Sequence, residues 1–167
     1  STLKPFLYAM ALDDGLIHSE SLLVDAPQSF GGYRPGNFQA AFSGPVSVSE
    51  PLQRSLNVPA VDLLDRVGPA RFASTLRAAG LRLRMGAGIP PNLSLILGGG
   101  GTTLEELVAA YRALARERPE GFRLMFAAAA PQELLDRAGL TIVGSGVAVT
   151  GEEHALDAAR TFTAWAN

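Results

Sequence analysis

The sequence predicts a mainly α-helical protein that carries one small β-hairpin, and three observations support this fold class. Apolar residues recur at helical spacing in several segments of residues 1–118, and glycines and prolines separate these segments. Hydroxyl side chains that suit helix N-caps precede two of the segments. Two runs of β-type residues, 140–143 and 147–150, flank Gly144-Ser145-Gly146, which is the pattern of a hairpin.

Composition limits the classes of protein to which the chain can belong. Its 167 residues are 47% hydrophobic and 18% charged, which suits one ordinary domain with a hydrophobic core. The net charge of -2 gives no electrostatic case for binding nucleic acid or an anionic membrane surface. The absence of cysteine excludes disulfides and thiolate chemistry. No apolar run approaches the ~18 residues that span a bilayer, so we expect either a cytosolic protein or a piece of a longer chain whose targeting segment lies elsewhere.

Residues 1–14 predict a buried first helix. Apolar side chains cover nearly its whole circumference, as is usual for a buried helix. Pro5 is tolerated because it lies in the first turn, and Gly15 suits the left-handed position that follows the last turn. Ser1 and Lys4 lie three positions apart and therefore share one helix face. A neutral lysine amine in that position can take the proton from a serine hydroxyl.

Few other side chains in the sequence are candidates for acid–base chemistry. Lys4 is the only lysine, and the other 13 of the 14 cationic side chains are arginines, which do not lose their protons at physiological pH. A single lysine on an apolar helix therefore indicates that an amine able to lose its proton is needed at this position. The simpler alternative is a surface lysine whose stem lies along the apolar helix while its amine reaches the solvent. The only histidines, His18 and His154, are far apart, and we expect both at the surface.

The segment 16–47 predicts extended pieces and turns, because Gly and Pro interrupt it repeatedly. We expect one short extended piece at Leu22–Asp25. We also expect a rigid turn at 33–37, held by Pro35 and by the side chain of Asn37. A loop of this length inside a compact domain is usually functional or wraps the core.

Residues 47–80 predict a run of short helices. Ser47 or Ser49 is expected to cap the first of them. Pro59 should force Val58 away from the helical region, so that the next helix begins after it. The remaining boundaries of these helices fall at Gly68, Pro69 and Gly80.

A second irregular zone precedes the longest predicted helix. The apolar run 93–97 fits a buried strand or the end of a helix, and four glycines follow it at 98–101. No Gly-Lys-Ser/Thr follows these glycines, so we expect a tight backbone approach rather than a phosphate loop. The longest helix is expected at 103–118, with Thr102 or Thr103 as its cap. Beyond it, 119–167 predicts helix, hairpin and helix.

Ordered motifs along residues 1–115 resemble those of a known family. The first is Ser-x-x-Lys at Ser1 and Lys4, and the second is Ser-x-Asn at Ser55 and Asn57. Together they resemble the transpeptidase domain of class A penicillin-binding proteins, whose motifs are Ser-x-x-Lys, Ser-x-Asn and Lys-Thr/Ser-Gly. The resemblance also includes Tyr33-x-Pro35-x-Asn37, 42–46, 52–61, 95–99 and 104–111.

The resemblance implies a role for each motif residue. Ser1 would be the nucleophile that attacks the D-Ala-D-Ala carbonyl of a peptidoglycan stem peptide, and Lys4 would be the base. Ser55 would relay the proton to the leaving amine. Asn57 would hold the amide of the acyl donor and orient Lys4. A β-lactam would be trapped as an acyl-enzyme at Ser1, and neither a cofactor nor a metal is implied.

The resemblance also implies an organisation. Residues 1–118 would be the helical part of the α+β, β-lactamase-like fold of the family, incomplete here, and 119–167 would be a divergent tail. The chain would be a fragment of a bifunctional cell-wall synthase, and the remainder would include a membrane anchor and a glycosyltransferase domain. The parent family is periplasmic and anchored in the inner membrane. The third motif has no counterpart, since no lysine follows Lys4.

Two alternatives remain open from the residues alone. The first is a non-catalytic helical remnant or peptide-binding module. The second is an N-terminal-nucleophile hydrolase, in which the α-amine of Ser1 is the base. That class needs its nucleophile at the start of a strand, whereas this sequence starts with a predicted helix.

Overall fold

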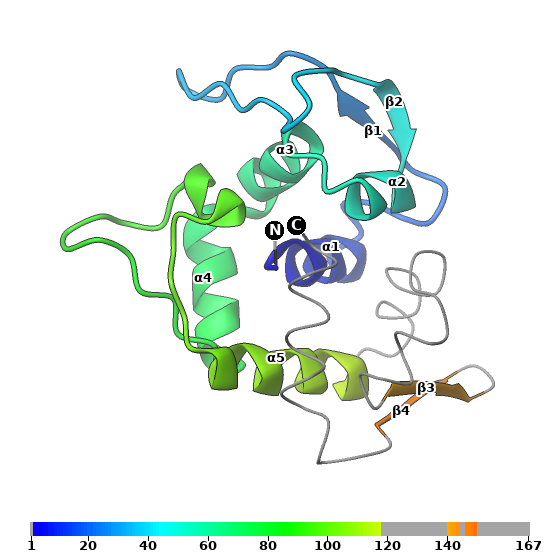
Figure 1. Cartoon of the computed structure of the whole chain (residues 1–167), viewed down its shortest axis with the longest axis vertical. Coiled ribbons are helices and arrows are strands. Elements are labelled where there is room, and N and C mark those ends of the chain that lie inside the picture. The colour runs from blue at the N-terminus through cyan, green and yellow to red at the C-terminus, as the bar shows by residue number, and fades with distance from the viewer. Residues whose placement is uncertain (1, 118–139, 144–145, 150–167) are drawn as a thin grey trace.

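The structure, a computed structural model, describes residues 2–117, 140–143 and 146–149. Helices dominate it, and two short antiparallel ribbons accompany them (Figure 1). The predicted class, mainly helical with a small hairpin, is thereby confirmed. In chain order the elements are α1 Lys4–Asp13, β1 Leu22–Asp25, β2 Gly44–Ser47, α2 Ser49–Gln53, α3 Val58–Val67, α4 Pro69–Ala78, the 3-10 helix η1 Leu93–Leu97, α5 Leu104–Glu117, β3 Leu140–Val143 and β4 Gly146–Val149.

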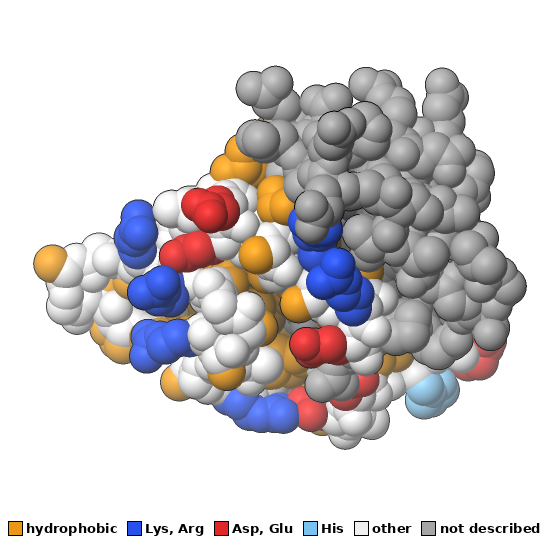
Figure 2. Space-filling view, turned by 90° about the horizontal axis from the view of Figure 1, so that it is seen from below, with side chains coloured by type: hydrophobic (Ala, Val, Ile, Leu, Met, Phe, Trp, Pro, Cys, Tyr) orange, Lys and Arg blue, Asp and Glu red, His pale blue; other side chains and the backbone are white. Residues whose placement is uncertain are grey.

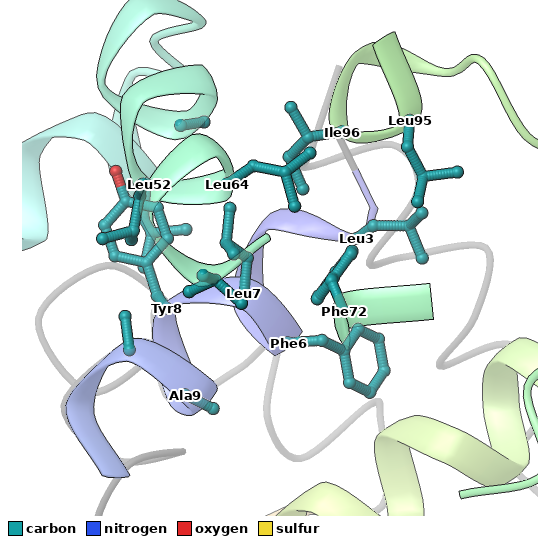
Figure 3. Packing of buried hydrophobic residues seen from close by; sticks show 14 of the residues in the cluster. Leu3, Phe6, Leu7, Tyr8, Ala9, Leu52, Leu64, Phe72, Leu95 and Ile96 are labelled. Carbon is teal, nitrogen blue, oxygen red and sulfur yellow. The ribbon is translucent and has the colours of Figure 1, made fainter. Parts of the chain in front are cut away.

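Helix α1 is the centre of the hydrophobic core, and the other helices surround it (Figure 1). Seven of its ten residues are buried, so its nearly continuous apolar surface faces protein on most sides. Phe6 and Leu7 of α1 lie beside Leu64 of α3 and Phe72 of α4 (Figure 3). Burying side chains of this size stabilises a fold by roughly 1.5–3 kcal/mol each, so α1 contributes a large share of the core.

The start of α1 differs from the prediction, whereas its end agrees. The helix begins at Lys4 rather than at residue 1. Pro5 has no amide proton to donate to the carbonyl of residue 1, so the regular ladder starts later, with the Leu7 amide donating to the Leu3 carbonyl at 3.3 Å. After the last turn, Gly15 adopts a φ of 66°, the left-handed conformation expected of it.

The ribbon β1–β2 confirms one expectation and corrects another. Strand β1 has the predicted bounds, but β2 was not predicted, because Gly44 and Pro45 suggest a turn. Both residues are accommodated because β2 pairs with one strand only, and an edge strand tolerates a missing amide proton. Ser47 therefore belongs to β2 and does not cap α2. Ser49 is the first residue of α2 rather than its cap, and no side chain caps that helix.

Helix α3 begins at Val58, one residue before Pro59, so the predicted break at this position is wrong. The backbone restriction before a proline is a bias, and packing overrides it here because Val58 is completely buried. Pro59 occupies the first turn, where its missing amide proton is not needed. Asn57 consequently lies at the N-cap position of α3.

The glycine run after η1 makes the predicted tight backbone approach. A Cβ atom on Gly99 would lie 2.2 Å from the Ser94 hydroxyl oxygen and 2.9 Å from the Ser94 carbonyl. The run 93–97 is a 3-10 helix, so the strand alternative is excluded. Thr103 is the cap of α5, since its hydroxyl accepts a hydrogen bond from the Glu106 amide at 3.2 Å.

The hairpin at 140–149 is confirmed as the antiparallel pair β3–β4. The helices predicted on either side of it lie outside the described residues, and so does His154. His18 is exposed, as expected. Within 2–117 and the two hairpin strands, no helix is both long and apolar enough to cross a bilayer.

Charged side chains of both signs are mixed over the described surface. In the face shown in Figure 2, acidic and basic groups lie next to one another with apolar groups between them. Arg71 forms an ion pair with Asp14, and Arg82 forms another with Glu106 at 3.6 Å. Exposed pairs of this kind each contribute less than about 1 kcal/mol. They accordingly add less to stability than the burial of α1.

The buried Tyr8 and the half-buried Tyr111, which packs against the core, differ in their hydroxyl groups, and this difference gives a test of the packing. The hydroxyl of Tyr8 is buried without a hydrogen-bond partner, whereas that of Tyr111 donates to the Thr2 carbonyl. Tyr8→Phe should raise the free energy of unfolding by about 1 kcal/mol, and Tyr111→Phe should lower it by about 1 kcal/mol. Urea unfolding of both variants measures the difference. Equal losses of stability in the two would contradict this packing.

Candidate active site

The amine of Lys4 is buried and makes three hydrogen bonds to one turn of the chain. Its Nζ donates to the Ser55 carbonyl at 2.8 Å, to the Ser55 Oγ at 3.1 Å and to the Asn57 Oδ1 at 2.9 Å. Only 2% of Lys4 is exposed. An ammonium has three N–H donors, so these contacts satisfy all of them. The alternative of a surface lysine is therefore wrong for Lys4.

The turn that receives Lys4 joins α2 to α3 and has an unusual backbone. Ser55 adopts a φ of 52°, a left-handed conformation that costs a non-glycine residue about 1–3 kcal/mol. In this conformation both the carbonyl and the hydroxyl of Ser55 face Lys4. The next residue fixes the turn in place, because Leu56 is buried in the core and its amide donates to the Pro51 carbonyl at 2.8 Å.

Burial lowers the pKa of Lys4 to about 8. At pH 7.5 roughly a quarter of the amine is then neutral, compared with roughly one part in a thousand for a lysine of ordinary pKa. Only the neutral amine can accept a proton. The burial of Lys4 thus increases the fraction of neutral amine at pH 7.5 by more than two orders of magnitude.

Asn57 is held so that its amide oxygen faces Lys4. Although it occupies the N-cap position of α3, its side chain does not cap that helix. Its Nδ2 donates to the Gly36 carbonyl at 2.9 Å, and its backbone amide donates to the Asn37 Oδ1 at 2.8 Å. With Nδ2 engaged by a carbonyl, Oδ1 is the atom left to accept from Lys4.

Two residues of this network, Asn37 and Asp25, were not among the predicted site residues. Asn37 donates to the Asp25 carboxylate at 2.7 Å and to the Ala41 carbonyl at 3.0 Å. Asp25 is completely buried at the end of β1 and also accepts from the Ser43 amide at 2.9 Å. The sequence signalled Asn37 as a turn residue, but it held no local signal for contacts to β1 and to α3.

Tyr111 is a further residue near the start of α1 that was not among the predicted site residues. Its hydroxyl donates to the Thr2 carbonyl at 2.5 Å, and its ring packs on Phe6 with the centroids 4.6 Å apart. It therefore connects α5 to the residues that precede α1.

Of the four predicted site residues, the structure brings together Lys4, Ser55 and Asn57. Ser1 lies outside the described residues, and its place in the site stays a sequence prediction. Among the described residues, no group of three or more histidine or carboxylate side chains gathers as a metal site would require.

Comparison with known proteins identifies the class. Residues 1–117 match the family described as the penicillin binding protein transpeptidase domain. This match covers well over half of the chain, so the chain belongs to the penicillin-binding protein transpeptidase family. The resemblance drawn from the two motifs is thereby confirmed.

Among curated proteins, the chain is similar to penicillin-binding protein 1C of Escherichia coli K12, with 58% identity over 121 residues. That match covers 72% of this chain and 16% of the relative. Penicillin-binding protein 1F of Bacillus subtilis is 35% identical over 100 residues, which is 59% of this chain and 13% of the relative. The chain therefore spans about a sixth or less of the length of these relatives.

Solved structures confirm the fold. The penicillin-binding protein PonA1 from Mycobacterium tuberculosis superimposes with a TM-score of 0.61 at 25% identity, over 71% of this chain and 34% of that one. The PonA1 complex with penicillin V gives a TM-score of 0.60 at 26% identity, over 69% of this chain and 34% of that one. The described helices and the β1–β2 ribbon are thus part of a penicillin-binding protein transpeptidase fold.

The lowered pKa of Lys4 predicts how stability changes with pH. Because the folded-state pKa, about 8, is below the ordinary value of 10.5, the unfolded chain binds more protons between these pH values. The free energy of unfolding should therefore gain about 3 kcal/mol from this group as pH rises from 7 to above 10. The free energy of unfolding of the wild type, measured relative to that of Lys4→Met, should rise by the same amount over this pH range.

Urea unfolding of the wild type and Lys4→Met at several pH values measures this change. Arg34→Met is the matched control, since it removes an exposed cationic side chain from another part of the surface. A constant difference between wild type and Lys4→Met from pH 7 to 10.5 would contradict a lowered pKa.

Proposed function

We propose that the chain carries the catalytic residues of a serine acyl-enzyme D,D-transpeptidase of peptidoglycan cross-linking, which also binds penicillin. The observation that supports this proposal is the buried amine of Lys4, with its lowered pKa and its contacts to Ser55 and Asn57. Membership of the transpeptidase family supports the same reaction class. In this proposal Ser1 is the nucleophile and Lys4 is its general base.

In the acylation step, the Oγ of Ser1 attacks the carbonyl carbon between the two terminal D-Ala residues of a stem peptide. The proton of the hydroxyl passes to the neutral Lys4 amine as the new C–O bond forms. The C–N bond then breaks, and the departing D-Ala amine takes a proton through the Ser55 hydroxyl, which lies 3.1 Å from Lys4. The products are an ester at Ser1 and free D-Ala.

In the second step, an amine of a neighbouring stem peptide attacks the ester and forms the cross-link, or water attacks and hydrolyses it. Asn57 orients Lys4 throughout and is proposed to hold the amide of the acyl donor. A β-lactam would acylate Ser1 by opening its ring. The PonA1 structure with penicillin V shows that a structurally similar protein binds a β-lactam.

The proposed organisation follows the family. Residues 1–118 would form the helical part of the transpeptidase domain, and 119–167 would form a divergent tail. We propose that the parent protein acts in the periplasm with a membrane anchor and a glycosyltransferase domain. No lysine follows Lys4 in the sequence, so the third family motif has no counterpart here. In the family, the strand that carries this motif also helps to build the oxyanion site. Removing one oxyanion donor alone slows catalysis about 10²–10³-fold, so we expect slow acylation of this chain.

Covalent labelling tests the proposed function. Incubation of the 167-residue chain with a fluorescent penicillin should give one label, and peptide mass spectrometry should place it on Ser1. Ser1→Ala should abolish the label, and Lys4→Met should slow labelling about 10²–10⁴-fold because the general base is lost. Ser19→Ala, which removes an exposed hydroxyl from another loop, is the matched control and should label normally.

If the correctly folded chain stays unlabelled at high penicillin concentration, the enzymatic proposal is contradicted. That result would support the non-catalytic helical module instead. Labelling that survives Ser1→Ala would exclude Ser1 as the nucleophile.

A further inference from the structure

A continuous series of hydrogen bonds connects the buried carboxylate of Asp25 to the Lys4 amine. It runs from Asp25 to Asn37, from Asn37 to the Asn57 backbone, and from the Asn57 side chain to Lys4. The four residues belong to β1, the 26–43 loop, the start of α3 and the start of α1. The series therefore crosses the whole site between distant parts of the chain.

We propose that Asn37 and Asp25 are positioning residues of the site, which together hold the 55–57 turn over the Lys4 amine in one orientation. The catalytic consequence of this inference rests on the proposed function. The positioning itself does not, because it concerns contacts within the described residues.

The hydrogen-bonding capacity of each group allows only one arrangement of the two asparagines. An ionised carboxylate can only accept, so Asp25 requires the Nδ2 of Asn37 to face it. The second N–H of that Nδ2 donates to the Ala41 carbonyl, which leaves Oδ1 of Asn37 to accept from the Asn57 amide. The Gly36 carbonyl orients the Asn57 side chain in the same way.

Asp25 is itself fixed by the fold. It is completely buried, its second oxygen accepts from the Ser43 amide, and it pairs with Gly44 in the β1–β2 ribbon. A buried carboxylate is costly unless hydrogen bonds satisfy it, so its presence at this position indicates a specific role. We infer that its role is to set the orientation of the Asn37 side chain.

The alternative is that Asn37 and Asp25 stabilise the loop without affecting Lys4. The titration of Lys4 distinguishes the positioning role from a purely stabilising role. The pKa of Lys4 is low because the amine is buried, and the 55–57 turn provides the three acceptors that contact this amine. These acceptors are uncharged, and the Asp25 carboxylate is joined to them through the two asparagines. Loosening the turn would admit water to the amine and raise its pKa.

The test uses the fact that Lys4 is the only lysine in the sequence. Selective labelling with ¹³C- and ¹⁵N-lysine gives one side-chain signal, whose titration midpoint NMR measures directly. The wild type should titrate near the pKa of about 8. Asn37→Ala should move the midpoint to about 9 or above, toward the ordinary lysine value. Gln28→Ala, which removes another side-chain amide of the 26–43 loop, one that donates to the Val24 carbonyl of β1, should leave the midpoint unchanged.

Asp25→Asn is a second variant, which keeps the volume of the side chain. The two possible effects of this substitution change the pKa of Lys4 in opposite directions. Removing a negative charge would by itself lower the pKa of a nearby lysine. Freeing Asn37 to rotate, and so loosening the turn, should raise it. A rise in both Asn37→Ala and Asp25→Asn supports the proposal, whereas a midpoint that stays near the wild-type value in Asn37→Ala, or falls in Asp25→Asn, overturns it.

Acylation by fluorescent penicillin is the second readout. If the wild type is labelled, Asn37→Ala should slow labelling at least about tenfold, because the neutral fraction of Lys4 and its orientation both decline, and Gln28→Ala should not. A labelling rate in Asn37→Ala equal to that of the wild type overturns the catalytic consequence. If the wild type is not labelled, the proposed function fails, and the Lys4 titration still decides the positioning role.

Discussion

The ammonium of Lys4 lies in the interior of the protein, where each of its three donors must find a partner. A buried cation without partners would cost several kcal/mol and would tend to lose its proton instead. The 55–57 turn meets this requirement with two oxygens of Ser55 and one of Asn57. Burial lowers the pKa of Lys4, and the three acceptors carry no charge that would raise it again.

Much of the rest of the fold makes that arrangement possible. Helix α1 carries Lys4 into the core because its other faces are apolar and buried. The strained turn at Ser55 persists because Leu56 is buried beside it and because Asn57 is held through Asn37. The β1–β2 ribbon, which looks remote from the site in sequence, supplies the carboxylate that fixes Asn37 (Figure 1). Energy gained by packing thus stabilises a local geometry that would be unfavourable alone.

Local chemistry predicted most of the helices and part of the site. Pro69, Gly15 and Gly80 marked helix boundaries, and motif spacing selected Lys4, Ser55 and Asn57. What could not be predicted depends on contacts between distant residues. Strand β2 forms because it pairs with β1, and this pairing outweighs the unfavourable effect of Pro45 on a strand. The contacts of Asn37 reach 12 positions to Asp25 and 20 positions to Asn57, beyond the range of any periodic pattern.

The central claim is that a buried, weakly basic Lys4, held by the 55–57 turn, serves Ser1 as its base. A crystal structure of the chain after reaction with a penicillin tests it most directly. The account predicts continuous density from the Oγ of Ser1 to the opened β-lactam, with the Lys4 Nζ within hydrogen-bonding distance of Ser1, Ser55 and Asn57. A structure in which Ser1 is unmodified, or in which the Lys4 amine points to solvent away from the turn, would contradict it.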